Sequence, residues 1–374
     1  MHRQRNIVHI CNNYISSKVH ARLISSVDCQ SGVTQDVYVP VRRLSDIGVN
    51  AFGSSSVGVT YDYCLPAFIK FFPLLKVLWV SYRFYMRMYR RRGGVVVAHS
   101  LWSDGFPAFL CSKIFGGSYS VFIRGTDLNF FLPKLPHYRL IFWLIVRFSD
   151  NVFFVSPAHR SEFRRRYPNI FKAAKKEVIL PNGVDSFWLE NKIEKQLPRS
   201  DLLFVGRFDK NKNIAMVIKV YEEYVKIHPS AKLRLVGGDV KALIELGIEV
   251  LPPGVEVLGK VNAFEPLQKL YRTSAVLLVP SISETFGLVY IEALTQGCPV
   301  VHTKGQGVSG YFDSCDYVYA SDCRDVDDLT RGVLFLTDRY PMGVPAECVN
   351  SKLERFSWSC ISFAFVREIF GGLS

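Results

Sequence analysis

Two glutamates eight residues apart, Glu284 and Glu292, lie in the part of the sequence that says most about chemistry (VPSISETFGLVYIEALTQGCPVV, residues 279–301). If the chain between them were entirely helical, the two carboxylates would lie roughly 12 Å apart and about 80° around the helix axis. The acid and the nucleophile of a glycosidase lie within about 5–9.5 Å of each other, so the pair fits hydrolysis poorly. The spacing suits the two ends of one long ligand with a diphosphate between them, such as a nucleotide sugar.

The residues around this pair predict a strand, a turn and a helix. An apolar run over 275–279 predicts a buried strand that ends at a proline, and Gly287 precedes a helix predicted over 288–295. The backbone N–H groups near Phe286, Gly287 and Leu288 are then unpaired at a helix N-terminus. Such groups form a ready site for phosphate.

The segment resembles the E-x7-E signature of retaining glycosyltransferases of family four, which have the GT-B fold. The resemblance implies that Glu292 accepts hydrogen bonds from the ribose hydroxyls and that Glu284 holds hydroxyls of the transferred sugar. It also implies that the backbone over 286–288 meets phosphate and sugar. The alternative for a spaced pair alone is two solvated glutamates on an amphipathic helix. The Phe-Gly-Leu sequence between them and Gly-Cys-Pro-Val-Val over 297–301 argue against that alternative.

A basic loop follows the first predicted strand of the second half. Its sequence, Val-Gly-Arg-Phe-Asp-Lys-Asn-Lys over 205–212, resembles the family's G-R-x4-K element, with Arg207 and Lys212 as the basic pair. Cations here would neutralise a diphosphate leaving group as its charge grows. Lys210 remains an alternative to Lys212, and a solvated basic loop remains an alternative to both. By the same resemblance, the turn containing Val261 packs the nucleotide base.

The resemblance is looser in the first half. Relatives carry a Gly-rich loop after the first strand, whereas residues 12–18 here contain no glycine. Side-chain hydrogen bonds, with Asn13 among the candidates, are expected to replace a close backbone approach to a ligand.

Three further residues in the first half are candidates for the site, Arg124 and Asp127 for contact with the acceptor or the cleft and His99 for catalysis. Arg124 and Asp127 lie in a turn that resembles the family's H-G-x-D, with arginine in place of histidine. A guanidinium can bind an anionic sugar or a phosphate bidentately. Pairing of Arg124 with Asp127 across the turn is the alternative. His99 follows a predicted strand and is a candidate catalytic residue, although a histidine in this position can equally be structural.

Alternating strands and helices predict an α/β protein of two Rossmann-like, doubly wound halves facing across a cleft, as in the GT-B fold. We expect an N-terminal acceptor-binding domain over 1–185 and a nucleotide-sugar-binding domain over 186–355. The Asn-Gly-Val-Asp turn at 182–185 would be a hinge or a wall. A C-terminal helix, 356–374, is expected by resemblance to cross back onto the first domain. Strands are predicted over 6–11, 95–99, 119–123, 152–155, 202–205, 233–236, 255–258, 275–279 and 300–301, and further helices over 108–115 and 138–148.

Composition narrows the class of protein. The chain has 374 residues, 49% of them hydrophobic and 21% charged, which is typical of a globular protein of two domains. No uncharged apolar run approaches the 18 or more residues of a membrane-spanning helix, and the apolar run 7–11 is too short for a signal peptide. The nine cysteines show no C-x2-C spacing. A cytoplasmic protein is expected, without a zinc site or a disulfide framework.

The positive charge is concentrated in the first half. The formal net charge of +13 divides into +16 for residues 1–183 and −3 for residues 184–374. Within the first half, the segment 67–92 interleaves aromatic residues with cations, and Arg83, Arg87 and Arg90 share a helical face by their spacing. Such a helix can lie in an anionic membrane surface. An ordinary amphipathic crossover helix is the alternative, and no known RNA- or DNA-binding module accompanies the charge.

Metal-dependent transferases of the other main fold use a D-x-D pair to hold a divalent ion. Asp325 and Asp327 have that spacing but lie in an acidic stretch expected to be helical, with no strand expected before it. We interpret them as a solvated face and expect an enzyme without metal or cofactor.

These features predict a retaining glycosyltransferase that uses a UDP- or GDP-sugar. The acceptor would be a saccharide, lipid-linked at the inner face of the cytoplasmic membrane, as in surface polysaccharide assembly. No nucleophile is placed near the sugar, which favours a front-face route. A binding module that keeps the donor site without transfer is the alternative. An oxidoreductase with two Rossmann halves is disfavoured because no G-x-G-x-x-G follows a strand.

Overall fold

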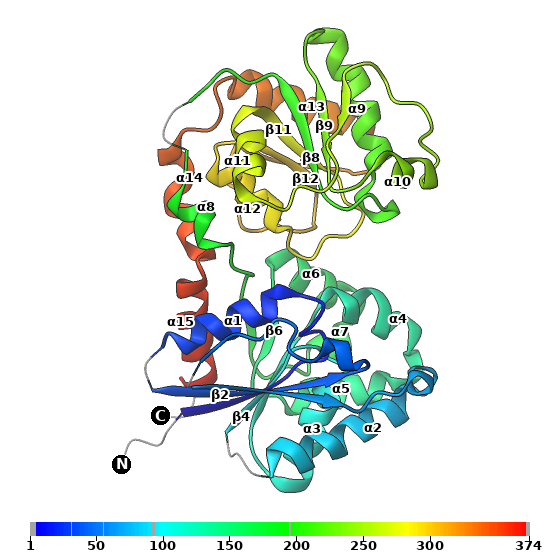
Figure 1. Ribbon diagram of the computed structural model, residues 1–374, viewed down its shortest axis with the longest axis vertical. Helices are drawn as coiled ribbons and strands as arrows, with labels where there is room; N and C mark the ends of the chain where they lie inside the picture. The colour runs from blue at the N-terminus through cyan, green and yellow to red at the C-terminus, as the bar shows by residue number, and fades with distance from the viewer. Residues whose placement is uncertain (1–4, 31, 55, 91–93, 194–195, 372–374) are drawn as a thin grey trace. The chain divides into compact units, whose positions relative to one another are not determined.

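The computed structural model describes residues 5–30, 32–54, 56–90, 94–193 and 196–371, without the side chains of Ala67 and Lys70 (Figure 1). The chain forms two compact units. The first contains the described residues up to Val155, residues 160–183 and those from Trp358 onward. The second contains 156–159 and 184–357. Apart from the short excursion of 156–159, the chain therefore passes between units at 183–184 and 357–358, within two residues of the expected limits. The cations expected at 91 and 92, and the helix end expected over 372–374, lie outside the described residues.

A sheet of seven parallel strands forms the centre of the first unit. The strand order is β3-β2-β1-β4-β5-β6-β7, so the chain reverses its direction of winding between β1 and β4. The strands are β1 (Arg5–Ile10), β2 (Val33–Val41), β3 (Val57–Tyr63), β4 (Val95–Ala98), β5 (Tyr119–Phe122), β6 (Val152–Phe154) and β7 (Glu177–Ile179).

Alternate residues of each strand point to opposite faces of this sheet. In β4, Val96 and Ala98 join a core with Phe84 of α2 and Phe142 of α5. Val95 and Val97 join a second core with side chains of α1 and α15. The helices of this unit are α1 (Lys18–Asp28), α2 (Pro73–Phe84), α3 (Gly105–Phe115), α4 (Leu132–Lys134), α5 (Arg139–Phe148), α6 (Pro157–Arg166, which begins in the second unit), α7 (Pro168–Phe171) and α15 (Trp358–Phe370).

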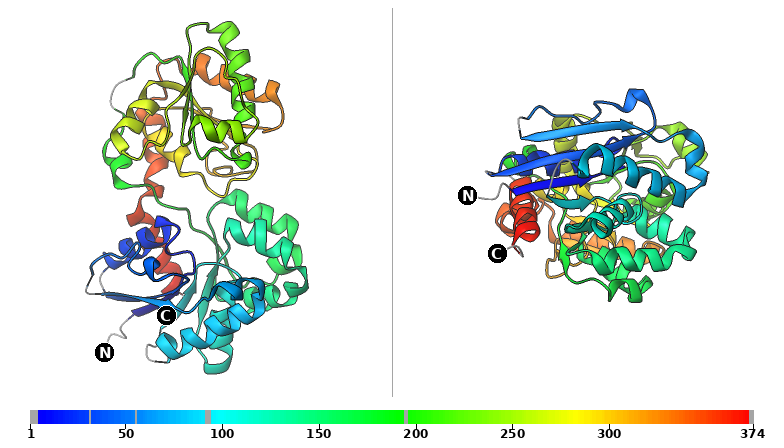
Figure 2. Two further views of the ribbon diagram at one scale, coloured as in Figure 1. Left: turned by 45° about the vertical axis from the view of Figure 1, so that its right-hand side comes forward. Right: turned by 90° about the horizontal axis from the view of Figure 1, so that it is seen from below.

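The last helix of the chain belongs to the first unit. Helix α15 lies against α1 (Figure 2), where Ser26 Oγ donates to the Trp358 carbonyl oxygen at 2.8 Å. Phe365, on the inner face of α15, is fully buried against β1, β4 and β5. Within the described residues, no helix combines the length and the hydropathy that crossing a bilayer requires.

The second unit repeats the same architecture. Its six parallel strands have the order β10-β9-β8-β11-β12-β13, with the reversal between β8 and β11. They are β8 (Asp201–Val205), β9 (Leu233–Val236), β10 (Val255–Val257), β11 (Ser274–Val279), β12 (Val300–Thr303) and β13 (Val318–Ser321). The helices are α8 (Ser186–Glu190), α9 (Ile214–Ile227), α10 (Val240–Glu245), α11 (Phe264–Thr273), α12 (Leu288–Thr295), α13 (Val326–Arg339) and α14 (Ala346–Leu353).

Candidate functional site

The topology of the second unit brings its two sequence motifs together. The basic loop follows β8 and the glutamate segment follows β11, and these strands are neighbours at the point where the winding reverses. The carboxyl ends of parallel strands lie at one edge of the sheet, and ligands bind there in open α/β sheets. Residues 206–212 and 280–287 therefore meet at the expected ligand-binding edge.

Asparagine side chains lock the two loops together. Asn211 Nδ2 donates to the Ser283 carbonyl oxygen at 2.9 Å, and the Ser283 N–H donates back to Asn211 Oδ1 at 3.0 Å. Asn213 has φ 57° and donates to the carbonyl oxygens of Pro280 and Cys323. Asparagine tolerates the left-handed conformation, so position 213 does not require glycine.

Lys212 and Glu284 form an ion pair across these loops. Lys212 Nζ lies 2.6 Å from Glu284 Oε2, and the two side chains are only 15% and 16% exposed. Lys212 ends a short 3-10 turn, Lys210–Lys212. The Asp209 side chain caps the start of this turn by accepting from the Lys212 N–H. Lys210 is exposed. Of the two lysines that the sequence left open, Lys212 is the one that the fold directs at the glutamate segment.

Arg207 is the exposed cation of this edge. Its side chain is 82% exposed and pairs with Asp209 at 3.3 Å. It borders a hollow of about 540 Å³ that Lys260 also lines, whereas Val261 is not part of the lining. The expected base-binding turn thus contributes its lysine rather than its valine. The lining residues are Arg207, Phe208, Gly237, Gly238, Asp239, Ala242, Gly259 and Lys260.

Backbone donors are available at the start of α12. Gly287 has φ 78°, a conformation that glycine adopts readily, and it precedes Leu288, the first residue of the helix. In the described part of the chain, the N–H groups of Phe286, Gly287 and Leu288 have no hydrogen-bond acceptor. The Phe286 side chain is 2% exposed, so only its backbone can meet a ligand. Unpaired donors at this position suit an anion.

Glu292 lies on α12, where Tyr271 Oη donates to its carboxylate at 3.2 Å. Burial raises the pKa of Glu292 to about 7. A carboxyl group with this pKa changes charge near neutral pH, so the capacity of Glu292 to accept hydrogen bonds depends on pH in the working range.

In the first unit, a chain of buried histidines crosses the reversal point between β1 and β4. His9 Nε2 lies 3.1 Å from Gln35 Oε1, His9 Nδ1 lies 3.0 Å from His99 Nε2, and His99 Nδ1 lies 3.1 Å from His20 Nδ1. Gln35 donates its amide to the Ile24 carbonyl, so its oxygen must accept from His9. With neutral rings, His99 then donates to His9 and His20 donates to His99. Burial lowers the pKa of His9 to about 4 and lowers the pKa of His20 and His99.

This arrangement corrects the expectation for His99. The residue is fully buried, and both of its ring nitrogens lie within hydrogen-bond distance of other histidines, so it presents neither to a ligand. Sequence reasoning missed His9, His20 and Gln35. The available signal was a histidine at position 9 inside an otherwise apolar strand.

Asp127 is part of the framework at the same edge. Its carboxylate is fully buried and accepts from the backbone N–H groups of Leu101 (3.0 Å), Trp102 (3.3 Å) and Arg124 (2.9 Å). Burial raises its pKa to about 7. Through these three hydrogen bonds, the carboxylate joins the loop after β4 to the loop after β5. The expectation that Asp127 contacts an acceptor is wrong for this buried position.

Arg124 is held through its side chain without pairing to Asp127. Its Nε donates to the His99 carbonyl oxygen at 3.3 Å, and the guanidinium lies 4.4 Å from the centre of the Phe122 ring. Burial lowers its pKa to about 10. The side chains of Arg124 and Asp127 make no ion pair in the described part of the structure. The residue remains partly exposed and is a candidate for binding an anion.

Asn12, rather than Asn13, fastens the glycine-free loop after β1. Its backbone N–H and its Nδ2 donate to Asp104 Oδ1 at 2.9 and 2.6 Å. Asn13 is half-buried and its carbonyl oxygen accepts from Ser16. The expectation that a side chain of this loop replaces the backbone approach to a ligand stays a prediction.

The two aspartates with D-x-D spacing belong to a helix start. Asp325 caps α13 and accepts from the N–H groups of Asp327 and Asp328. Strand β13 ends four residues earlier, so the expectation that no strand precedes them is wrong. A different group, Cys11, His20 and His99, places three potential metal ligands within 4.8 Å of one another. The hydrogen bond between His20 and His99 occupies one nitrogen of each ring.

Residues 188–342 match the family described as glycosyl transferases group 1. Over 113 residues the chain is 38% identical to an uncharacterized glycosyltransferase of Methanocaldococcus jannaschii, a match that covers 29% of this chain and 28% of that protein. The first three curated relatives are matched over only 28–39% of their own length.

The fold has close counterparts among solved structures. The lipopolysaccharide outer core galactosyltransferase WaaB superposes with a TM-score of 0.70 at 16% identity, covering 98% of this chain and 99% of that one. Anabaena Alr3699/HepE, solved in complex with UDP and glucose, gives a TM-score of 0.66 at 15% identity over 98% of this chain and 100% of that one. These neighbours identify the fold as GT-B.

Proposed function

We propose that this chain, which carries a glycosyl transferases group 1 domain on a GT-B fold, is a retaining glycosyltransferase. It would move a sugar from a UDP- or GDP-sugar to a saccharide acceptor. The observation that carries the proposal is the edge of the second sheet. There the Lys212–Glu284 pair lies in the same loop system as the unpaired N–H groups of residues 286–288.

The parts of this edge match the parts of a nucleotide sugar. Unpaired backbone donors and two cations, Arg207 and Lys212, suit a diphosphate. Glu292, on the following helix, suits the ribose hydroxyls, and Glu284 suits the hydroxyls of the transferred sugar. The neighbour from Anabaena was solved with UDP and glucose, which supports a donor of this class.

During transfer, the bond between the sugar and the β-phosphate breaks and negative charge grows on the leaving diphosphate. Arg207 and Lys212 would stabilise that charge, which is the role a metal ion plays in other transferases. Glu284 would accept from the sugar hydroxyls through Oε1, while Oε2 contacts Lys212. We propose a front-face route in which the leaving phosphate takes the proton of the acceptor hydroxyl.

The acceptor is proposed to be lipid-linked, in surface polysaccharide assembly at the inner face of the cytoplasmic membrane. The excess positive charge of residues 1–183 and the lipopolysaccharide named for the neighbour WaaB support this. The exposed cationic face of this segment contains fewer arginines than the spacing predicted, because Arg83 is paired with Asp62. Arg87 and Arg90 remain exposed.

A binding module without transfer is the second candidate. It is favoured by the Lys212–Glu284 pair, which occupies Glu284 Oε2, and by the glycine-free loop after β1. Measurable turnover of a nucleotide sugar discards it.

Thermal-shift screening against UDP-, GDP- and ADP-sugars tests the function. A ligand at 100 times its Kd stabilises the native state by about 2.7 kcal/mol, which raises the unfolding temperature. We expect a shift with a UDP- or GDP-sugar, followed by release of the free nucleotide when an acceptor extract is added. Absence of any shift, or a shift with NAD alone, would refute the proposal.

The pKa of Glu292 makes donor binding dependent on pH. If the ribose hydroxyls bind the ionised carboxylate, the fraction available rises as the pH passes through about 7. The Kd of the nucleotide sugar should therefore fall about tenfold between pH 6 and pH 8. Calorimetric titration at three pH values checks this. In Glu292→Gln, binding should be weaker and independent of pH. An unchanged pH profile in that variant would assign the titration to another group.

A further inference from the structure

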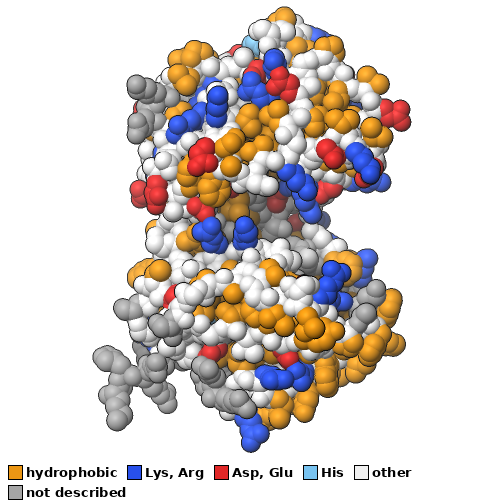
Figure 3. Space-filling model, in the orientation of Figure 1, with side chains coloured by type: hydrophobic (Ala, Val, Ile, Leu, Met, Phe, Trp, Pro, Cys, Tyr) orange, Lys and Arg blue, Asp and Glu red, His pale blue; other side chains and the backbone are white. Residues whose placement is uncertain are grey.

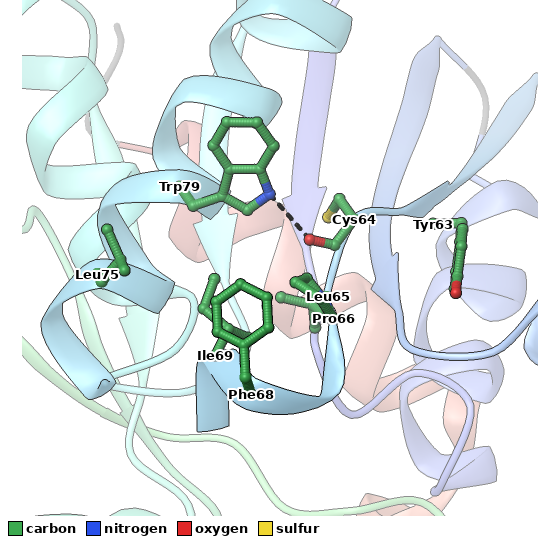
Figure 4. A pocket seen from close by; sticks show the side chains of 8 residues that line it. All are labelled: Tyr63, Cys64, Leu65, Pro66, Phe68, Ile69, Leu75 and Trp79. Atoms are coloured by element: carbon green, nitrogen blue, oxygen red, sulfur yellow. Dashed lines mark hydrogen bonds between the residues drawn. The ribbon is translucent and has the colours of Figure 1, made fainter. Parts of the chain in front are cut away.

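An apolar pocket of about 450 Å³ opens on the first unit beside the end of β3 (Figure 4). One wall is the segment that leaves β3, and the other is formed by the 3-10 turn Ala67–Phe71 and by α2. None of its lining residues is charged. The Trp79 Nε1–H donates to the Cys64 carbonyl oxygen at 2.8 Å, which occupies the only polar atom of that side chain. The lining residues are Tyr63, Cys64, Leu65, Pro66, Phe68, Ile69, Leu75 and Trp79.

The pocket continues into an exposed apolar surface. Phe68 is 60% exposed and Leu75 is 51% exposed, although both line the pocket. Figure 3 shows hydrophobic side chains gathered on the flank of the first unit where Figure 1 places α2. An apolar surface of this kind on a monomer usually marks a binding site. Further exposed apolar side chains of the segment are Phe71, Phe72, Leu78, Tyr82 and Met86.

The chemistry of the lining restricts the occupant. A saccharide, a nucleotide or a peptide backbone would bury hydroxyl, phosphate or amide groups here, and a buried polar group without a partner is costly. The hydroxyl of Tyr63 is the one side-chain polar group left on the wall. A pocket of this volume is large enough for a small-molecule chain. A hydrocarbon chain is the ligand that needs no hydrogen-bond partner.

The pocket lies next to the polar edge of the same sheet. It begins at the carboxyl end of β3, and the loops after β1 and β4 lie at that edge too. Leu75 and Trp79 share a face of α2 at a spacing of four, while the adjacent Lys76 reaches Ser103 Oγ at 3.3 Å. The Ser103 carbonyl oxygen accepts from Asn12 Nδ2, which also donates to Asp104 Oδ1. One turn of α2 therefore joins an apolar pocket to the ammonium group of Lys76.

We infer that this pocket takes the prenyl or acyl chain of a lipid-linked acceptor, whose polar end lies toward Lys76. The inference rests on the proposed function and narrows its substrate class. An amphipathic ligand matches both halves of the arrangement, since its chain meets the uncharged lining and its anionic head meets the ammonium group. The same site would select acceptors by the length of their hydrocarbon chain.

Binding of defined prenyl phosphates tests the inference. The full-length protein is titrated by calorimetry with geranylgeranyl phosphate and geranyl phosphate below their micelle concentrations, and with inorganic phosphate. Leu75→Gln is compared with Leu140→Gln, a matched control on α5 of the same unit at a side chain that is 67% exposed. We expect the longer chain to bind at least tenfold more tightly than the shorter in the wild type and the control. Leu75→Gln should remove most of that difference, because burial of each methylene stabilises the complex.

Four results would overturn the inference that this pocket binds a hydrocarbon chain. These are equal affinity for both chains, binding of inorganic phosphate as tight as that of geranylgeranyl phosphate, and an affinity difference that survives in Leu75→Gln. The fourth is a change in Leu75→Gln confined to sedimentation with phosphatidylglycerol vesicles or to the oligomeric state, which would make the surface a membrane or self-association face. Thermal shift by nucleotide sugars is measured in parallel. Absence of chain selectivity in the wild type with intact donor binding refutes this inference alone, whereas absent donor binding refutes the proposed function.

Discussion

Replacing Lys212 by methionine is expected to lower kcat/KM for sugar transfer by about 10²–10³. The loss of one preorganised donor to a developing oxyanion has an effect of this size in other enzymes. Methionine keeps most of the apolar stem, so the change removes the ammonium group that lies 2.6 Å from Glu284 and little else. Initial rates with the donor identified by thermal shift measure the effect.

The ion pair also contributes to folding, so the activity loss needs a stability control. Lys212→Met leaves the Glu284 carboxylate without its partner at a site that is largely buried, at a cost of about 1–3 kcal/mol. Glu284→Gln alone leaves the ammonium group in the same situation. The double variant removes both charges and should recover much of the stability, whereas its activity should stay low because the cation is still absent.

Lys210→Met is the matched control. Lys210 lies two residues away on the same 3-10 turn and is exposed, so its removal should change stability by no more than about 0.5 kcal/mol. Its activity should remain near that of the wild type. The reverse pattern, with Lys210→Met inactive and Lys212→Met active, would make Lys210 the cation that meets the diphosphate.

The second half of the site could be foreseen because its signals are local. Glycines before and after α12 set its limits, and the helix runs over Leu288–Thr295 as expected. The loop cations follow β8 and Glu284 follows the neighbouring strand β11, so a parallel sheet alone brings them close. What the motifs could not show is that Lys212 and Glu284 bind each other, because that contact joins residues 72 positions apart.

The first half was harder to foresee for physical reasons. Strands β2 and β3 were not predicted. Strand β2 carries Gln35, Asp36 and a proline within its buried run, whereas the alternating sequence of β3 (VGVTYDY) was a strand signal available in the sequence. The histidine chain joins β1, α1 and the end of β4 through contacts between distant residues. No periodicity or spacing in the sequence predicts such a network. In the sequence, His99 is an isolated candidate, whereas in the structure it is one of three hydrogen-bonded histidines.

Asp127→Ala is expected to destabilise the first unit by about 3–5 kcal/mol. The substitution leaves the buried N–H groups of Leu101, Trp102 and Arg124 without their acceptor, and each unsatisfied buried donor costs about 1–3 kcal/mol. Urea unfolding followed by tryptophan fluorescence reports mainly on this unit, because Trp188 is the only tryptophan of the second.

Asp127→Asn separates the framework role from a role in binding. Asparagine keeps the shape and one acceptor oxygen but turns an amide toward a backbone donor, so a smaller loss of about 1–2 kcal/mol is expected. Transfer activity should then fall in proportion to the folded fraction, with KM for the acceptor unchanged. A stable Asp127→Ala protein with a raised acceptor KM would instead restore the carboxylate to the binding site. That result would also require the loops after β4 and β5 to hold their geometry without the three hydrogen bonds that join them here.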